Sequence, residues 1–250
     1  MHPKIKVVIP SYESQLWLQN TLASVEVQTY KNFEAVIIDD ASPSEKNREL
    51  IRNFCKGKKR WSYHFNEVNT GSLANIIHGF EVLSCGDNDV VVILDGDDWL
   101  AHSRVLERIA FEYSYNHIYF TYGQCSVFPF KFPAKSYSLS KSCIKNCEYR
   151  DQPWIYVHLR TFAFSMWKYI RIEDLLDPRT NEYWKVTGDG AWIFPILELS
   201  GGRVKYIPET LYVYNRANPI CDAEIRPLEQ RTAAEYIRQL DRYEPLFDVS

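Results

Sequence analysis

The sequence predicts an α/β fold with a mostly parallel central sheet flanked by helices. Apolar runs of strand length alternate with amphipathic segments of helix length over the first half of the 250-residue chain. The run at 90–94 consists of five consecutive apolar residues, which is typical of a strand buried on both faces. It ends in three carboxylates, Asp95, Asp97 and Asp98, at the end of the strand where open α/β sheets bind ligands.

The predicted elements follow one another along the chain. Strands are predicted at 4–10, 33–38, 63–65, 89–94 and 117–122, and helices at about 18–28, 44–54, 72–80 and 105–113. The segment 124–150 is predicted to be irregular. Beyond it we expect a helix at 164–170, a turn at 174–179, a helix from 190 to Gly201, a strand pair or bent strand at 204–215, an irregular segment at 215–225 and a polar helix at about 228–243.

Composition narrows the class of protein. A net charge of −3 argues against nucleic acid as the main partner. No apolar run reaches the length of a transmembrane segment, and the N-terminus has no signal-peptide pattern, so we expect a cytoplasmic protein, peripheral at a membrane at most. The six cysteines form no C-x-x-C pair and are predicted to be free thiols. The high aromatic content, with 7 Trp and 17 Tyr, suits a site that stacks on sugar rings or a base.

The three acids after residue 94 indicate a cation site. Clustered carboxylates repel one another unless a cation lies among them, and Mn²⁺ or Mg²⁺ commonly bridges carboxylates to substrate phosphates. The alternative is a polar turn that caps the next helix. An EF-hand is excluded because Leu106 stands where the bidentate Glu would be needed. The strand at 33–38 also ends in acids, Asp39 and Asp40, so both strand ends are expected to face one nucleotide-type crevice.

Asp189 is a second candidate for chemistry. It stands between two glycines just before a predicted helix, where it is either a general base far in sequence from the other acids or simply the N-cap. His158 and Arg160 share one face of an extended segment and are candidates for acceptor or phosphate contacts. A structural histidine and an ordinary ion pair are the alternatives. The basic segment 124–150 is either a lid over an anionic ligand or a solvated loop.

Other catalytic motifs are missing from the sequence. There is no Gly-x-Ser-x-Gly elbow, no Gly-x-x-x-x-Gly-Lys-Ser/Thr loop and no Gly-x-Gly-x-x-Gly. A set of short motifs is present instead, in this order: Val-Val-Ile-Pro-Ser-Tyr12, Gln28-Thr-Tyr, Val36-Ile-Ile-Asp-Asp-Ala-Ser42, Asn69-Thr-Gly71 with Asn75, Leu94-Asp-Gly-Asp-Asp98, Gly188-Asp189 and Ile207-Pro-Glu-Thr-Leu-Tyr-Val-Tyr214. In order and spacing the chain resembles glycosyltransferase family 2, the inverting enzymes of the GT-A fold.

This resemblance implies roles for particular residues. Pro10, Tyr12 and Asp40 match positions that line the base and ribose of the donor nucleotide, and Asn69 and Gly96 lie in donor-site motifs. Asp95 and Asp97 match the D-x-D motif: Asp97 would hold the metal on the diphosphate, with Asp98 as a second candidate ligand, and Asp95 would lie nearer the ribose. Asp189 matches the base, although Gly188 replaces the usual Glu. The candidate acceptor-binding residues are Trp154, His158, Arg160 and Trp192.

The implied reaction is a single displacement. Asp189 would deprotonate an acceptor hydroxyl, which attacks the anomeric carbon of a UDP-, GDP- or dTDP-sugar and inverts its configuration; the acceptor would be a glycan or another hydroxyl compound. We expect one GT-A domain over 1–250, with a nucleotide-sugar-binding half at 1–123 and an acceptor-binding half with the C-terminal helix at 124–250. The alternatives are a sugar nucleotidyltransferase, which would need a Gly-rich loop where Pro10-Ser-Tyr-Glu-Ser stands, and an inactive sugar-nucleotide-binding module.

Overall fold

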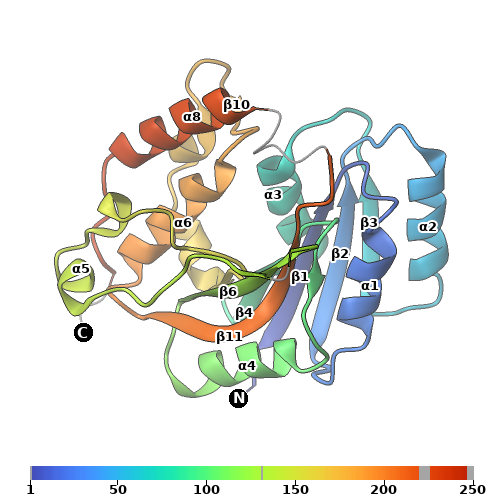
Figure 1. Ribbon diagram of the computed structural model, residues 1–250, viewed down its shortest axis with the longest axis horizontal. Coiled ribbons are helices and arrows are strands. Elements are labelled where there is room, and N and C mark those ends of the chain that lie inside the picture. The colour runs from blue at the N-terminus through green and yellow to red at the C-terminus, as the bar shows by residue number, and fades with distance from the viewer. Residues whose placement is uncertain (1, 131, 220–225, 247–250) are drawn as a thin grey trace.

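The computed structural model describes residues 2–130, 132–219 and 226–246, and it confirms the α/β fold class. A curled nine-stranded sheet in the order β3-β2-β1-β4-β8-β6-β11-β5, with β7 paired to β6, runs through the molecule. Figure 1 shows helices on both of its faces. None of the helices in these described ranges is long and apolar enough to cross a bilayer.

The first half follows the predicted pattern closely. The strands β1 (Lys4–Ser11), β2 (Phe33–Asp39), β3 (Trp61–Phe65) and β4 (Asp89–Ile93) pair in parallel. The helices α1 (Leu18–Glu26), α2 (Glu45–Cys55), α3 (Ser72–Val82) and α4 (Val105–Tyr115) lie within a few residues of their predicted bounds. The parallel pairing brings the C-terminal ends of β1, β2 and β4 to one edge of the sheet.

Alternate residues of these strands serve two separate hydrophobic layers, because side chains of a strand point to opposite faces. One layer contains Val8, Val36 and Val91 and is covered by α3 and by α6 (Gly188–Leu199). The other contains Val7, Ala35 and Val92 and is covered by α1, α2 and α4. Both faces of β1, β2 and β4 are therefore buried, which explains their continuous apolar runs.

The second half differs from the predictions at several points. β6 (Phe120–Phe128) begins later than expected and extends into the start of the segment 124–150, which was predicted to be irregular. The short helix α5 (Lys141–Lys145) interrupts the same segment, and the helix predicted at 164–170 is a 3₁₀ helix, Phe164–Tyr169. The sequence signals also missed β5 (Trp99–Leu100), β7 (Phe132–Pro133), β8 (Thr161–Ala163) and the small hairpin β9 (Leu176–Asp177) with β10 (Glu182–Tyr183), together with 3₁₀ turns at Tyr149–Asp151 and Ile172–Leu175.

β11 and the C-terminal helix complete the fold. β11 (Val204–Asn215) is the bent strand that the sequence allowed, with register shifts against β6 between Ile207 and Tyr212. The helix α8 (Pro227–Gln239) packs on α6. A buried Arg150 joins them: it forms a bidentate ion pair with Glu198 of α6 and donates to the Ile237 carbonyl of α8. Five cysteines are free thiols, as predicted; Cys221 and the end of the predicted irregular segment lie outside the described residues.

Candidate active site

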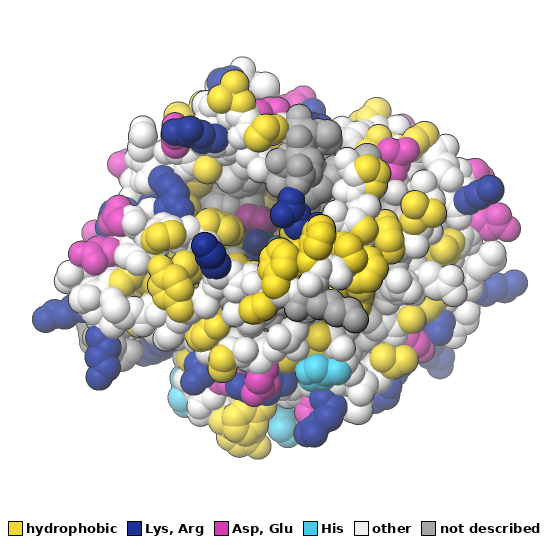
Figure 2. All heavy atoms as spheres, viewed as in Figure 1, with side chains coloured by type: hydrophobic (Ala, Val, Ile, Leu, Met, Phe, Trp, Pro, Cys, Tyr) yellow, Lys and Arg dark blue, Asp and Glu magenta, His cyan; other side chains and the backbone are white. Residues whose placement is uncertain are grey.

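One large cavity collects the candidate residues. Its volume is about 990 Å³, and Figure 2 shows the molecule hollowed there, with acidic and basic side chains inside. Every candidate site residue named from the sequence lines it. We call its two sides the strand-end wall (residues 10–14, 40, 69–76 and 95–98) and the helical wall (residues 154–160, 184–194 and 226–238).

The end of β4 is packed tightly against the end of β1. The Gly96 N–H donates to the Pro10 carbonyl at 2.9 Å, and a Cβ on Gly96 would lie 2.8 Å from the Ser11 Cβ. Gly96 does not have a positive φ angle, so a left-handed backbone conformation does not explain the glycine at this position. Glycine is required because the two chains approach too closely for a side chain, and this contact aims the following acids into the cavity.

The three acids after β4 are not equivalent. Asp98 is 1% exposed, and its carboxylate accepts from the Tyr212 hydroxyl at 2.6 Å and from the Asn215 N–H at 2.7 Å. It thereby fastens the β4 end to β11. The Asp97 carboxylate faces the cavity and accepts from the Asn218 amide at 2.7 Å. In the described part of the chain, no three His, Cys, Asp or Glu side chains form a ready-made metal site.

The electrostatics of this wall favour a cation. Burial, together with the negative charges of Asp189 and Asp97, raises the pKa of Asp95 to about 7. Burial also raises the pKa of Asp97. The carboxylate groups are thus held close together in a medium that opposes their ionisation. The donor set consists of carboxylate oxygens, which suit Mn²⁺ or Mg²⁺, and such ions usually complete their shell with substrate phosphates instead of a full protein cage.

Asp40 organises the loop beside these acids. Its buried carboxylate accepts from the backbone N–H groups of Thr70 and Gly71, both at 2.8 Å, and from the Asn66 amide at 2.9 Å. The Asn69 amide donates to the Asp40 carbonyl at 3.3 Å. Asp40 and Asn69 therefore line the strand-end wall as one hydrogen-bonded unit. Tyr12, by contrast, leaves 41% of its surface exposed at the mouth of that wall.

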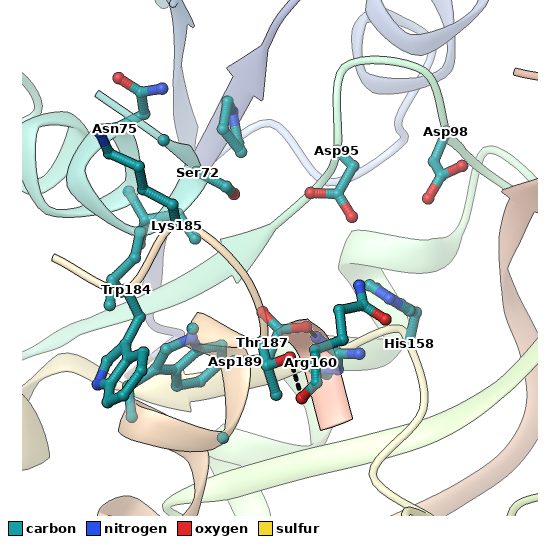
Figure 3. Close-up of a pocket in the computed structure, with 18 of the residues that line it drawn as sticks. Ser72, Asn75, Asp95, Asp98, His158, Arg160, Trp184, Lys185, Thr187 and Asp189 are labelled. Atoms are coloured by element: carbon teal, nitrogen blue, oxygen red, sulfur yellow. Dashed lines mark hydrogen bonds and ion pairs between the residues drawn. The ribbon is translucent and has the colours of Figure 1, made fainter. Parts of the chain in front are cut away.

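The unpredicted strand β8 brings Arg160 to the site. β8 runs antiparallel to β4, with Thr161 opposite Val92, so the residues just before Thr161 lie beside the C-terminal end of β4. Arg160 is 6% exposed and forms an ion pair with Asp189. Its Nε donates to the Tyr156 carbonyl at 2.8 Å, and its guanidinium lies over the Trp154 ring at 5.5 Å. Figure 3 shows the Arg160–Asp189 pair facing Asp95 and Asp98 across the cavity.

Asp189 lies in the first turn of α6. The N-cap is Thr187, in the left-handed region at φ 56°, so the N-cap interpretation of Asp189 is wrong. A Cβ on Gly188 would lie 3.1 Å from the Leu73 Cβ, because the first turns of α6 and α3 pack against each other. A Glu in place of Gly188 would meet this contact. The carboxylate of Asp189 is held by Arg160, with 41% of the side chain exposed to the cavity.

The remaining candidates differ in exposure. His158 stacks on the Tyr212 ring at 4.5 Å, and burial together with Arg160 lowers its pKa well below the usual value, so its ring is neutral at pH 7. Trp154 is 38% exposed in the cavity and can present a ring face to a ligand. Trp192 is only 1% exposed and packs against Phe162 at 5.2 Å, which makes it part of the cavity floor.

Several lining residues carry no signal in the sequence. Lys185, Arg231 and Arg238 line the helical wall, and Figure 3 shows Lys185 and Trp184 at the end of the cavity away from Asp98. Their positions depend on how α8 and the β9–β10 hairpin pack against α6. The pattern of basic residues on one face of the polar C-terminal helix is the only sequence feature that could have indicated Arg231 and Arg238.

Comparison with known proteins bears on this geometry. The family described as "Glycosyl transferase family 2" matches residues 6–167. The chain belongs to glycosyl transferase family 2. An uncharacterized glycosyltransferase of Haemophilus influenzae is 31% identical over 121 residues, 48% of this chain and 46% of that protein. GalNAc(5)-diNAcBac-PP-undecaprenol beta-1,3-glucosyltransferase of Campylobacter jejuni is 25% identical over 176 residues, 69% of this chain and 54% of that protein.

This family-2 chain spans about half the length of these curated relatives. Among solved structures, S. aureus TarS in complex with UDP-GlcNAc gives a TM-score of 0.68 at 15% identity, over 94% of this chain and 65% of that one. Mannosyltransferase PcManGT from Pyrobaculum calidifontis, in complex with GDP-Man and Mn²⁺, gives 0.62 at 15% identity, over 97% of this chain and 66% of that one. At such identities the likeness shows the shared fold, which is GT-A.

Proposed function

We propose that the protein is a metal-dependent, inverting glycosyltransferase that moves a sugar from a nucleoside diphosphate-sugar to an acceptor hydroxyl, in glycan or polysaccharide synthesis. The observation that carries this proposal is the opposition, across one cavity, of Asp189 to the carboxylates at the end of β4. Membership of glycosyl transferase family 2 supports the reaction class. The UDP-GlcNAc bound to TarS and the GDP-Man bound to PcManGT support the class of donor.

The strand-end wall would hold the donor. Pro10, Tyr12 and the Asp40–Asn69 unit would line the base and ribose. Gly96 allows its own strand end to lie close to Pro10 and Ser11 of β1. Asp97 would hold Mn²⁺ or Mg²⁺, with Asp95 beside it; Asp98 is less suited because both of its oxygens already accept hydrogen bonds. When bound, such a cation neutralises charge on the departing nucleoside diphosphate.

The helical wall would hold the acceptor and the base. Asp189 would accept the proton of the attacking hydroxyl, and its ion pair with Arg160 fixes the orientation of the carboxylate. Arg160 is itself held by the Tyr156 carbonyl and the Trp154 ring, so the pair forms a rigid unit. A hydroxyl deprotonated there would attack the anomeric carbon from the side opposite the leaving group. Attack from that side inverts the configuration.

A donor panel tests the proposal. The thermal stability of the protein should rise with one of UDP-, GDP- or dTDP-sugars when Mn²⁺ is present, because a ligand that binds only the folded state stabilises it. The same donor should be hydrolysed slowly to the nucleoside diphosphate, and EDTA should abolish this release. Metal-independent release would contradict the metal assignment, and no shift with any donor would contradict the ligand class.

The two alternative functions predict other products. An inactive binding module would show the thermal shift without any release of nucleoside diphosphate. A nucleotidyltransferase would release or consume pyrophosphate, which chromatography separates from a nucleoside diphosphate. Family membership favours glycosyl transfer over both.

A further inference from the structure

One face of α8 turns only basic and uncharged side chains toward the cavity. The lining residues of this region recur at helical spacing: Arg226, Pro227, Gln230, Arg231, Ala234, Ile237 and Arg238. The acidic residues of the same helix, Glu229 and Glu235, do not line the cavity. Arg231 and Arg238 are seven positions apart, which places them on one side of the helix about 10 Å apart along its axis.

The cavity is therefore electrically polar from one end to the other. Its strand-end wall contributes the acids Asp40, Asp95, Asp97 and Asp98. The part of the helical wall built by 184–188 and α8 contributes Lys185, Arg231 and Arg238, and among its described lining residues it has no acid. A protein with net charge −3 thus gathers cationic side chains at one end of this cavity.

These cations are available to a ligand. Arg238 is partly buried, and burial lowers its pKa; it donates to the Arg150 carbonyl and lies 5.2 Å from the Phe194 ring centroid. Within the described residues it has no carboxylate at ion-pair distance. Arg231 pairs with Glu235, and Lys185 with Glu182, each at 3.0 Å and each strongly exposed. Exposed pairs of this kind contribute little energy and exchange readily for a better partner.

The basic face lies next to Asp189. The Thr187 hydroxyl donates to the Gln230 carbonyl at 3.1 Å, and a Cβ on Gly190 would lie 3.3 Å from the Ile237 side chain. The residues on both sides of Asp189 in sequence are thus in contact with the residues next to Arg231 and Arg238. A molecule that places a hydroxyl at Asp189 has this basic face within reach. Arg150 holds α8 in this position through the Ile237 and Leu240 carbonyls.

We infer that the acceptor carries a negatively charged oxyanion, a phosphate or a carboxylate, which Lys185, Arg231 and Arg238 bind beside the base. This inference rests on the proposed function, because it assigns the helical wall to the acceptor. Charge-assisted hydrogen bonds to guanidinium groups are short and strong, and arginine matches planar oxyanions with two parallel bonds. The acids of the opposite wall offer this oxyanion no favourable partner, so the polarity of the cavity also orients the acceptor.

Three simple probes test the inference: glucose 6-phosphate, glucuronate and glucose. Their binding to the full chain should be measured by calorimetry at low ionic strength, with EDTA present so that no metal contributes. At least one charged probe should bind about tenfold more tightly than glucose, a difference of about 1.4 kcal/mol. Preference for glucose 6-phosphate identifies a phosphate, and preference for glucuronate identifies a carboxylate. Equal or undetectable binding of all three probes would overturn the inference.

Variants locate the binding. The double variant K185Q/R231Q, whose native partners are both exposed, should lose most of the preference for the charged probe. R104Q is the control, because Arg104 is a similarly exposed arginine, paired with Glu107 at 3.0 Å, and it does not line the cavity. R104Q should keep the full preference. A preference that survives in K185Q/R231Q, or is lost equally in R104Q, would refute the assignment to α8.

The donor assay separates this inference from the proposed function. The inference assigns these cations to the acceptor and not to the donor. The affinity for the nucleoside diphosphate with Mn²⁺ should therefore change by less than about twofold in K185Q/R231Q, which corresponds to less than about 0.5 kcal/mol. Weaker nucleotide binding with an unchanged probe preference would show that the cations serve the donor, and would overturn the inference. Failure of the donor panel in the wild type would instead refute the proposed function.

Discussion

The two walls of the cavity hold their acidic groups by different means. On the strand-end wall, Asp40 and Asp98 accept hydrogen bonds from backbone N–H groups of Thr70, Gly71 and Asn215. On the helical wall, Asp189 is held by the side chain of Arg160, which a short antiparallel strand brings to the site. Backbone contacts depend on the path of the chain, whereas side-chain pairs depend on two particular residues. Substitutions should therefore distinguish a donor side that is fixed by the path of the chain from an acceptor side that depends on single side chains.

The largest effect is expected from Asp189→Asn. Loss of a general base costs about 10²–10⁴-fold in rate, so transfer should nearly stop while donor binding on the opposite wall persists. Transfer rates and a donor thermal-shift assay measure the two quantities separately. D151N is a matched control, because Asp151 is also an exposed carboxylate paired with an arginine, Arg242, at 2.8 Å. Unchanged transfer in D189N would remove Asp189 as the base.

Asp97→Asn should act on the other wall. We expect the affinity for Mn²⁺ in the presence of donor to fall by about 100-fold. Loss of a residue that only supports a metal ligand lowers metal affinity by about 10–100-fold, and loss of the ligand itself should cost at least as much. Titration of Mn²⁺ against donor hydrolysis gives this affinity. D87N, at an exposed carboxylate paired with Lys168, should behave as the wild type. If D97N shows the same Mn²⁺ dependence as the wild type, the cation lies elsewhere.

Gly96→Ala tests whether the strand-end wall is rigid. The new Cβ would lie 2.8 Å from the Ser11 Cβ and 3.0 Å from the Pro10 carbonyl oxygen, both parts of a central strand. Overpacking of this kind costs about 1–3 kcal/mol in the free energy of unfolding. Gly86→Ala is the control, since its nearest neighbour would be an oxygen of Asp89 at 3.9 Å. Denaturant unfolding of both variants measures the difference; equal stabilities would show that the β1–β4 contact yields easily.

The smallest effect concerns pH and His158. Its pKa is lowered well below 6.5 in the folded protein, so below about pH 6.5 the unfolded chain binds the extra proton and the folded state does not. Its contribution to stability is thus present above pH 6.5 and is lost as the pH falls toward the folded-state pKa. H158F should remove a slope of up to about 1 kcal/mol per pH unit between pH 6.5 and 5. If the unfolding free energies of both proteins depend on pH in the same way across this range, the neutral His158 ring is contradicted.

Local sequence patterns were sufficient for the strand-end wall. β1, β2 and β4 were predicted within two residues, and Asp40, Asp95 and Asp97 were placed at one edge, because parallel strands bring their carboxyl ends together. The sequence placed Gly96 only in a donor-site motif, because its close approach to Ser11 is a contact between two strands. The N-cap alternative for Asp189 failed for a similar reason. Which residue caps α6 depends on how Thr187 and Gly188 pack against α8 and α3.

What the sequence by itself determined is the parallel core and the acids at its edge, because strand periodicity and chain order are local and repeat along the chain. What only the tertiary structure decided is the helical wall. β8 has only three residues and no periodicity of its own. Arg160 and Asp189, which form an ion pair, lie 29 residues apart in the sequence. The basic face of α8 lines the cavity only because α8 packs against α6. Contacts of this length are fixed by packing and charge pairing in the folded chain, and no short window of sequence contains them.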